Sequence, residues 1–84
     1  MIPVEMNTFH GGLQMVYKFD NGYGASVIQH EGSYGGKSSL WELAVLDMFG
    51  ALCYDTDITS DVLGYLPWSE VETKLIEINR LHID

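Results

Sequence analysis

An alternating segment followed by Asn-Gly constrains the fold of this 84-residue chain more than any other feature. In residues 13–19 every second residue is a large apolar one, and Val16 is the single apolar residue on the other face. A period of two is typical of a strand with one buried face. Asn21 and Gly22 both tolerate the positive φ that tight hairpin turns require. We therefore predict a hairpin whose second strand covers residues 24–30.

A second hairpin is predicted after a glycine-rich loop. Residues 40–46 form an apolar run. Ser39 precedes this run and Glu42 lies in it, and the two have the spacing of a helix capping box. A helix here would have barely two turns, whereas residues 47–50 look like a four-residue turn that ends in glycine. Residues 51–55 then have the length of a returning strand. We predict the hairpin, with a helix over the first segment as the alternative.

The C-terminal part of the chain predicts a helix. Residues 61–66 are expected to form one helical turn, which Pro67 ends because proline cannot continue it. Ser69 and Glu72 then have the spacing of a second capping box, at the start of a longer helix. The apolar stripe of that helix consists of Val71, Leu75 and Ile78.

The order hairpin, hairpin, helix predicts an α+β fold, in which a four-stranded antiparallel sheet carries the C-terminal helix on one face. We expect a single domain over residues 1–84, with residues 1–12 as a loosely ordered leader. A chain of this length is too short for a Rossmann fold, a barrel enzyme or two domains. Val16 indicates that the second sheet face is partly apolar, which favours a homodimer or another partner on that face.

The charge of the chain restricts its partners. It has 12 acidic and 4 basic residues, for a net charge of -8. No Lys or Arg occurs between Lys37 and Lys74, a stretch that contains seven acids. Such a surface repels phosphate groups, so we expect no direct nucleic-acid binding and no binding to anionic membranes. It attracts a protein with a basic surface and accelerates the encounter.

Cysteine content and hydropathy predict the compartment. Cys53 is the single cysteine, which excludes an intrachain disulfide. Residues 1–12 have neither the basic nor the apolar region of a secretory signal. No apolar run approaches the roughly 18 residues that a transmembrane helix needs. The chain is therefore expected to be cytoplasmic.

One glycine-rich segment resembles a phosphate-binding loop. Residues 32–38 read Gly-Ser-Tyr-Gly-Gly-Lys-Ser, but only three residues separate Gly32 from Gly36, where nucleotide hydrolases have four. A nucleotide-hydrolysing loop is therefore not expected. In a weaker alternative, the loop binds a nucleotide or another small ligand through Ser33, Tyr34, Gly35, Gly36 and Lys37.

The acidic residues Asp55, Asp57 and Asp61 do not fit a calcium-binding loop. Counted from Asp55, position 6 of such a loop requires glycine and position 12 requires glutamate, but Ser60 and Leu66 occupy these positions. Zinc needs three or four converging ligands. The three histidines, His10, His30 and His82, show no spacing of that kind. We predict no metal site and no cofactor.

Catalytic residues are scarce in this chain. His30 with Cys53 is a pair that would supply a base and a nucleophile. Cys53 lies in an apolar segment, however, where cysteine is usually a packing residue. Too few groups remain to fill the geometric roles of an active site, so we predict that the protein is not an enzyme.

Several short motifs together resemble those of small accessory proteins of tailed bacteriophages. The motifs are GYGASVI (22–28), SYGG (33–36), LWELAVL (40–46), CYDT (53–56) and DVLGYL (61–66), and the resemblance covers about residues 17–80. It implies no active site. It does imply a common task of small acidic phage proteins, which is to bind and disable a host protein in the host cytoplasm. CRISPR effectors and other nucleases are such targets, because their nucleic-acid channels are basic.

Our leading hypothesis is a non-enzymatic, anti-CRISPR-like interaction protein that binds a host protein with a basic surface. The acids of the docking surface are expected to give a fast encounter, and its aromatic residues to give affinity. The predicted surface consists of Asp55, Asp57, Asp61, Tyr65, Trp68, Glu70 and Glu72. The alternatives are the ligand-binding loop described above, and a virion or assembly component that uses the apolar second sheet face as an oligomer contact.

Overall fold

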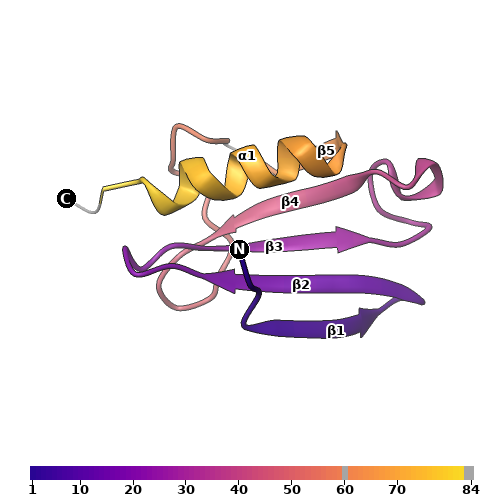
Figure 1. Ribbon diagram of the computed structural model, residues 1–84, viewed down its shortest axis with the longest axis horizontal. Coiled ribbons are helices and arrows are strands. Elements are labelled where there is room, and N and C mark those ends of the chain that lie inside the picture. The colour runs from indigo at the N-terminus through magenta and orange to yellow at the C-terminus, as the bar shows by residue number, and fades with distance from the viewer. Residues whose placement is uncertain (60, 83–84) are drawn as a thin grey trace.

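The computed structural model describes residues 1–59 and 61–82, which form one antiparallel sheet and one long helix (Figure 1). The strands follow one another across the sheet in chain order, and each pairs antiparallel with the next. The elements are β1 (Glu5–Phe9), β2 (Gly12–Lys18), β3 (Gly24–Gln29), the 3-10 helix η1 (Gly36–Ser38), β4 (Trp41–Leu46), β5 (Leu63–Leu66) and α1 (Trp68–Asn79). The predicted α+β class, with an antiparallel sheet and a C-terminal helix, is confirmed. The predicted number of four strands is wrong, because the sheet has five.

The additional strand, β1, lies within the segment 1–12 that we expected to be a loosely ordered leader. Phe9 pairs with Gly12, so the turn between β1 and β2 has only two residues. Both of them, His10 (φ 48°) and Gly11 (φ 78°), have a positive φ. This combination is typical of the two-residue turn whose twist matches that of a hairpin. His-Gly is a weaker hairpin signal than Asn-Gly, so local sequence did not predict this turn.

The predicted hairpin of β2 and β3 is confirmed, but its turn uses one positive φ instead of two. Gly22 has a φ of 92°, whereas Asn21 does not have a positive φ. The backbone N–H of Gly22 donates to the carbonyl oxygen of Phe19, and the N–H of Phe19 donates to the carbonyl oxygen of Tyr23. Asn21 therefore has a role other than backbone conformation: its side-chain amide donates a hydrogen bond to the carbonyl oxygen of Ile78 in α1.

The strand predicted over residues 40–46 is confirmed as β4, and the turn at residues 47–50 is also present. The predicted returning strand over 51–55 is wrong, because it is reduced to one bridge between Leu46 and Leu52 and a hydrogen bond from Cys53 N–H to the next β4 carbonyl. The rest of the β4 edge pairs with β5. The helical turn predicted over 61–66 is therefore also wrong. An extended β5 satisfies backbone groups of β4, which a local helical turn cannot do.

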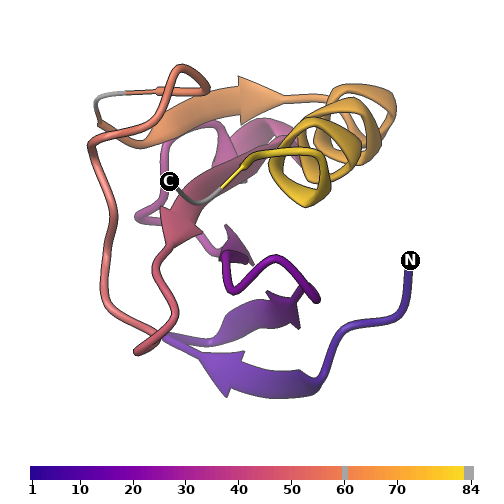
Figure 2. The same cartoon turned by 90° about the vertical axis from the view of Figure 1, so that its left-hand side faces the viewer.

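Helix α1 packs against one face of the sheet, as predicted, and contacts β3, β4 and β5 (Figure 2). It begins one residue before the predicted cap: Pro67 occupies the N-cap position, and no side chain caps the helix N-terminus. Its predicted apolar stripe is buried, and each such side chain contributes about 1.5–3 kcal/mol by leaving water. The buried residues of the core are Met15, Tyr17, Ala25, Val27, Leu43, Val45 and Leu66 from the sheet and Val71, Leu75 and Ile78 from the helix. We call this side of the sheet the helix face and the other side the open face.

A membrane-spanning helix was not expected from the sequence. Among the residues that the structure describes, no helix is both long enough and apolar enough to cross a bilayer.

Candidate functional site

Three of the predicted docking residues lie together in the connection between β4 and β5. Asp55, Asp57 and Asp61 are all exposed. Threonine side chains hold part of the backbone of this connection: the Thr59 hydroxyl accepts a hydrogen bond from the N–H of Asp61 at 3.0 Å and donates one to the carbonyl oxygen of the same residue. The N–H of Ile58 donates to the Thr56 hydroxyl at 3.3 Å. The Asp61 carboxylate accepts a hydrogen bond from the N–H of Val62 at 2.8 Å, so its other oxygen and the carboxylates of Asp55 and Asp57 are the groups exposed to solvent or to a partner.

These aspartates have no cationic partner within the described part of the chain. Over residues 1–59 and 61–82, the one ion pair joins Lys74 to Glu77 at 3.2 Å, on the exposed side of α1. The same residues contain no group of three or more side chains placed to hold a metal ion. The negative charge of the β4–β5 connection is thus left without internal compensation.

Tyr65 lies beside Tyr34, although the sequence analysis placed them in different candidate sites. The N–H of Tyr65 donates to the carbonyl oxygen of Tyr34 at 3.2 Å, and their ring centroids are 6.4 Å apart. Their exposed fractions are 65% and 58%, which makes them an exposed aromatic pair. Gly64 allows this approach, because a Cβ there would meet the Tyr34 Cβ at 2.5 Å. We call Asp55, Asp57, Asp61, Tyr34 and Tyr65 the β5 surface.

The glycine-rich loop uses its own amides to hold its shape. The N–H of Gly36 donates to the Ser33 carbonyl oxygen, and the N–H of Tyr34 donates to the Glu42 carboxylate at 3.2 Å. Amides of Gly32, Ser33, Ser38, Ser39 and Leu40 also donate within the loop or to His30. A phosphate-binding loop needs such N–H groups to point at the ligand. Lys37 is exposed, but most of the amides around it are already engaged.

The helical members of the predicted docking set lie apart from the β4–β5 connection. In Figure 2 that connection runs along one side of the molecule, and α1 lies on the other. Two residues of helix turn through about 200°, so Glu70 and Glu72 occupy opposite flanks of α1. Trp68 packs edge-on against Trp41, with ring centroids 5.3 Å apart. Glu72 lines a small depression with Trp68 and Met1. The seven predicted residues therefore do not form one continuous surface.

Glu72 also affects a buried tyrosine. Burial raises the pKa of Tyr17, which is 2% exposed, and the negative charge of Glu72 raises that pKa further. The Tyr17 hydroxyl lies 3.8 Å from the Met15 sulfur. Both the apolar surroundings and the nearby carboxylate disfavour the phenolate.

The pair of His30 and Cys53 is not brought together. The Cys53 N–H donates to the carbonyl oxygen of Val45, and Val45 pairs with Ala25 at the start of β3. His30 follows the other end of β3, five residues away, which corresponds to about 17 Å of extended strand. A base and a nucleophile at that separation cannot share a proton.

His30 instead belongs to a group of three rings that the sequence analysis missed. The centroid of its ring lies 5.4 Å from that of Phe9 and 5.3 Å from that of His10. The two-residue turn at the end of β1 brings these rings together, because it places Phe9 and His10 beside the end of β3. The His30 Nδ1 accepts a hydrogen bond from the Gly32 N–H at 3.0 Å, which orients the ring.

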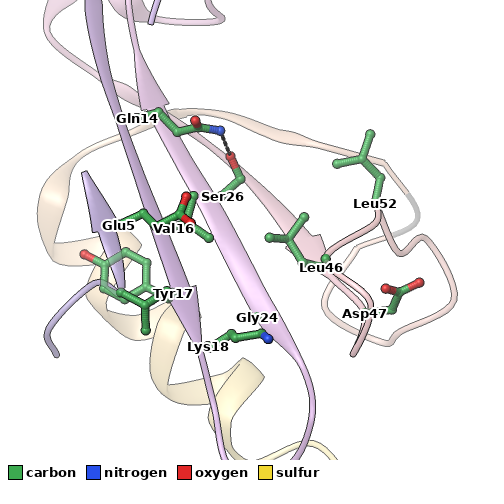
Figure 3. Close-up of a pocket in the computed structure, with 12 residues that line it drawn as sticks. Glu5, Gln14, Val16, Tyr17, Lys18, Gly24, Ser26, Leu46, Asp47 and Leu52 are labelled. Carbon is green, nitrogen blue, oxygen red and sulfur yellow. Dashed lines mark hydrogen bonds between the residues drawn. The ribbon is translucent and has the colours of Figure 1, made fainter. Parts of the chain in front are cut away.

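The open face of the sheet is hollowed into a groove of about 500 Å³ (Figure 3). Val16 and Ser26 form part of its floor, and Gln14 donates a hydrogen bond to the Ser26 hydroxyl at 3.1 Å. Glu5 stands on one side, and Leu52 of the turn after β4 stands on the other (Figure 3). The apolar Val16 on the otherwise polar side of β2 was the one sequence signal of this groove.

Comparison with known proteins adds no relative. No family model matches the chain, and no curated protein and no solved structure is detectably similar to it.

Proposed function

We propose that the protein is a non-enzymatic binding module that docks on a basic surface of another protein. The observation that supports this function is the β5 surface: three exposed aspartates without a cationic partner among the described residues stand in the connection that leads into β5, the strand that carries the exposed Tyr65. Uncompensated charge on one side of a small protein steers a partner of opposite charge. The aspartates would supply that steering.

The two tyrosines would supply most of the affinity. Charged residues at an interface mainly increase the association rate, whereas aromatic residues at its centre carry the binding energy. Tyr34 and Tyr65 are large, exposed and held in place by the hydrogen bond between their backbones. Glu70 and Glu72 would add to the negative field around the protein without belonging to the same contact, and the uncharged Trp68 packs against Trp41.

The proposed partner is a host protein that handles nucleic acid or takes part in defence, and the proposed setting is the cytoplasm of a bacterium infected by a phage. The charge of the chain and its resemblance to phage accessory proteins support this choice. A channel that holds phosphate groups is basic, so a patch of carboxylates competes for it. The ligand-binding alternative for residues 33–37 has weaker support, because the loop amides already donate within the protein.

The test is affinity capture from a nuclease-treated bacterial lysate, with quantification of every recovered protein. The variant reverses the charge of the β5 surface through Asp55→Lys, Asp57→Lys and Asp61→Lys. The matched control makes the same change at three exposed acids elsewhere, through Asp20→Lys, Glu31→Lys and Glu70→Lys. We expect the wild-type chain and the control to recover the same basic protein, and the β5 variant to lose it.

A second variant separates affinity from steering. Tyr34→Ala with Tyr65→Ala should increase the dissociation rate of the recovered partner by about tenfold or more, which corresponds to at least 1.4 kcal/mol. Raising the salt concentration should instead slow its association. Recovery of the same partner by the β5 variant and by the wild-type chain would show that the proposed surface is wrong.

A further inference from the structure

The two edges of the sheet differ in how they are protected. A free strand edge presents unpaired N–H and C=O groups, and proteins usually shorten, bend, charge or cover such edges. The β5 edge follows that pattern: β5 has four residues, its pairing with β4 contains an irregularity, and the N–H of Tyr65 donates to the carbonyl oxygen of Tyr34. Tyr65 also has a φ of 56°, which interrupts the extended conformation.

The β1 edge has little such protection. Its residues Glu5–Phe9 include neither lysine nor proline, and four of the five are exposed. Within the described residues, no strand pairs with its outer side. Its one irregularity lies at the start, where the N–H of Val4 donates to the Val16 carbonyl oxygen. The rest of β1 is therefore an open template for another strand.

The register of the hairpin shows which groups are free. Phe9 and Gly12 flank a two-residue turn, and such flanking residues exchange hydrogen bonds with each other. Hydrogen-bonded and non-hydrogen-bonded pairs alternate along an antiparallel ladder. Phe9, Asn7 and Glu5 therefore bond to β2, whereas Met6 and Thr8 direct their N–H and C=O groups outward.

We infer that β1 is a dimerisation strand, which pairs antiparallel with β1 of a second copy of this chain. Full overlap of the five residues places Asn7 opposite Asn7 of the other copy, on the two-fold axis. Met6 then lies opposite Thr8 of the other copy, and their outward groups make four hydrogen bonds across the axis. The result is a continuous ten-stranded sheet with closed two-fold symmetry, in which both helices lie on the same face.

Side chains and charges are compatible with this pairing. Glu5 lies opposite Phe9 of the other copy, and the two Glu5 residues are about 13 Å apart along the strands, which exceeds the Debye length of about 8 Å in physiological salt. Strand β5 lies at the opposite edge of the sheet from β1 (Figure 1). Dimerisation through β1 therefore leaves β5 and its exposed Tyr65 free.

The helix face near β1 gives the second copy an apolar surface to cover. Helix α1 lies over β3, β4 and β5, and Met6, on the helix face of β1, is 62% exposed. Pairing with a second β1 brings two such methionines together on the floor between the two helices. Burial of this apolar surface adds to the backbone hydrogen bonds. A basic partner protein has no such complementarity to β1, whose single charged residue is Glu5.

The first test measures the molar mass of the purified chain by light scattering over an about hundredfold range of concentration. We expect the mass to rise from the 9.4 kDa of one chain toward twice that value. Met6→Lys should raise the dissociation constant at least about tenfold, because charged lysine protects a strand edge. Met48→Lys is the matched control, since Met48 is 51% exposed on the turn after β4, and it should change the constant by less than about twofold.

The second test determines the register by cross-linking. Two cysteines in a non-hydrogen-bonded pair have Cα atoms about 4.5 Å apart, a distance that a disulfide can span. Asn7→Cys should therefore form a covalent dimer rapidly under mild oxidation. Thr8→Cys, which faces Met6 of the other copy, should cross-link more slowly, and so should the wild-type chain with Cys53 alone.

Either of two results would overturn the inference. One is a wild-type mass of 9.4 kDa at every concentration. The other is a dimer that Met6→Lys leaves unchanged and in which Thr8→Cys cross-links faster than Asn7→Cys. Circular dichroism of each variant identifies loss of folding, and a folded Met6→Lys monomer supports the inference. The charge-reversed β5 variant should still dimerise, which separates this surface from the proposed partner site.

Discussion

The side-chain amide of Asn21 donates a hydrogen bond to the carbonyl oxygen of Ile78 at 2.8 Å, which joins the β2–β3 turn to the last turn of α1. The same nitrogen donates to the carbonyl oxygen of Leu81 at 3.0 Å. The Asn21 Oδ1 accepts a hydrogen bond from the N–H of Tyr23. The Ile78 carbonyl oxygen also accepts the N–H of Leu81 at 3.1 Å, so Asn21 adds a second donor at the end of the helix and a donor to the Leu81 carbonyl just beyond it.

Replacement of Asn21 should therefore destabilise the fold through the contact between turn and helix. We expect Asn21→Ala to lower the free energy of unfolding by about 1–2 kcal/mol. Asn21→Asp should cost more, because the carboxylate cannot donate to the carbonyls and places negative charge at the negative end of the helix. Urea denaturation measures both changes. Asn79→Ala, an exposed substitution in the same turn of α1, should cost less than about 0.7 kcal/mol, and an equal loss there would refute the specific role of Asn21.

The approach of the glycine-rich loop to the end of β3 predicts a steric effect at Gly36. A Cβ at this position would overlap the carbonyl oxygen of His30 and lie 2.6 Å from the Ser33 hydroxyl oxygen. Gly36→Ala should therefore lower the free energy of unfolding by roughly 2–3 kcal/mol, as overpacking does. Gly50→Ala is the comparison, because Gly50 has a φ of 78° and open space around it. Its cost should be about 1 kcal/mol, from backbone strain alone.

The buried hydroxyl of Tyr17 predicts a loss of stability at alkaline pH. Because burial and then Glu72 raise the pKa of Tyr17 above the ordinary value of 10.0, the unfolded chain releases this proton at a lower pH than the folded chain. The contribution of the protonated Tyr17 hydroxyl to the free energy of unfolding is fully present below about pH 10. It is lost as the pH rises through the pKa of Tyr17 in the folded state. Denaturation curves as a function of pH should show a steeper alkaline decline for the wild-type chain than for Tyr17→Phe.

The role of Glu72 in that titration is tested separately. Glu72→Gln should shift the ionisation of Tyr17 to lower pH, because it removes the negative charge that is the weaker of the two causes of the raised pKa. Burial, the stronger cause, should still keep the pKa of Tyr17 raised. The measurement is phenolate absorbance, taken as the difference between each protein and the same protein with Tyr17→Phe. Glu70→Gln, on the opposite flank of α1, should leave the difference curve in place.

The turn after β4 depends on Asp47. Its Oδ1 accepts hydrogen bonds from the N–H of Phe49 at 2.8 Å and of Ala51 at 3.0 Å. Asp47→Ala should lower the free energy of unfolding by about 1.5–2 kcal/mol, whereas Asp47→Asn retains an acceptor oxygen and should cost under about 1 kcal/mol. Asp20→Ala, in the other exposed turn, should stay within about 0.5 kcal/mol. Equal effects of the two Asp47 substitutions would indicate that charge, and not hydrogen bonding, holds this turn.

Local patterns predicted the elements whose signals lie within a few residues. The alternation in residues 13–19 and the Asn-Gly pair predicted β2, β3 and their hairpin, and the spacing of Val71, Leu75 and Ile78 predicted the buried stripe of α1. They missed β1, because residues 5–9 are mostly exposed and have no buried face to produce alternation. They also misassigned residues 61–66, where the hydrogen-bonding needs of β4 outweigh local helix propensity.

The candidate site depended more on tertiary structure. The sequence identified the aspartates of the β4–β5 connection as exposed acids, because charged residues without cations nearby in the chain remain in water. It did not associate Tyr34 with Tyr65, because 30 positions separate them in the chain and only the return of the chain through β4 and β5 brings them together. It also grouped Glu70 with Glu72, which the rotation of the helix separates.

The amino-acid sequence by itself determined the polarity of each segment and therefore the strands with a regular buried face, the helix and the negative surface. Only the tertiary structure decided which edge of the sheet stayed open, which side chain satisfies the end of α1 and which exposed tyrosines meet. The physical reason is that periodicity and charge belong to neighbouring residues, whereas hydrogen-bond partners and close contacts are selected among all segments that the compact fold brings together.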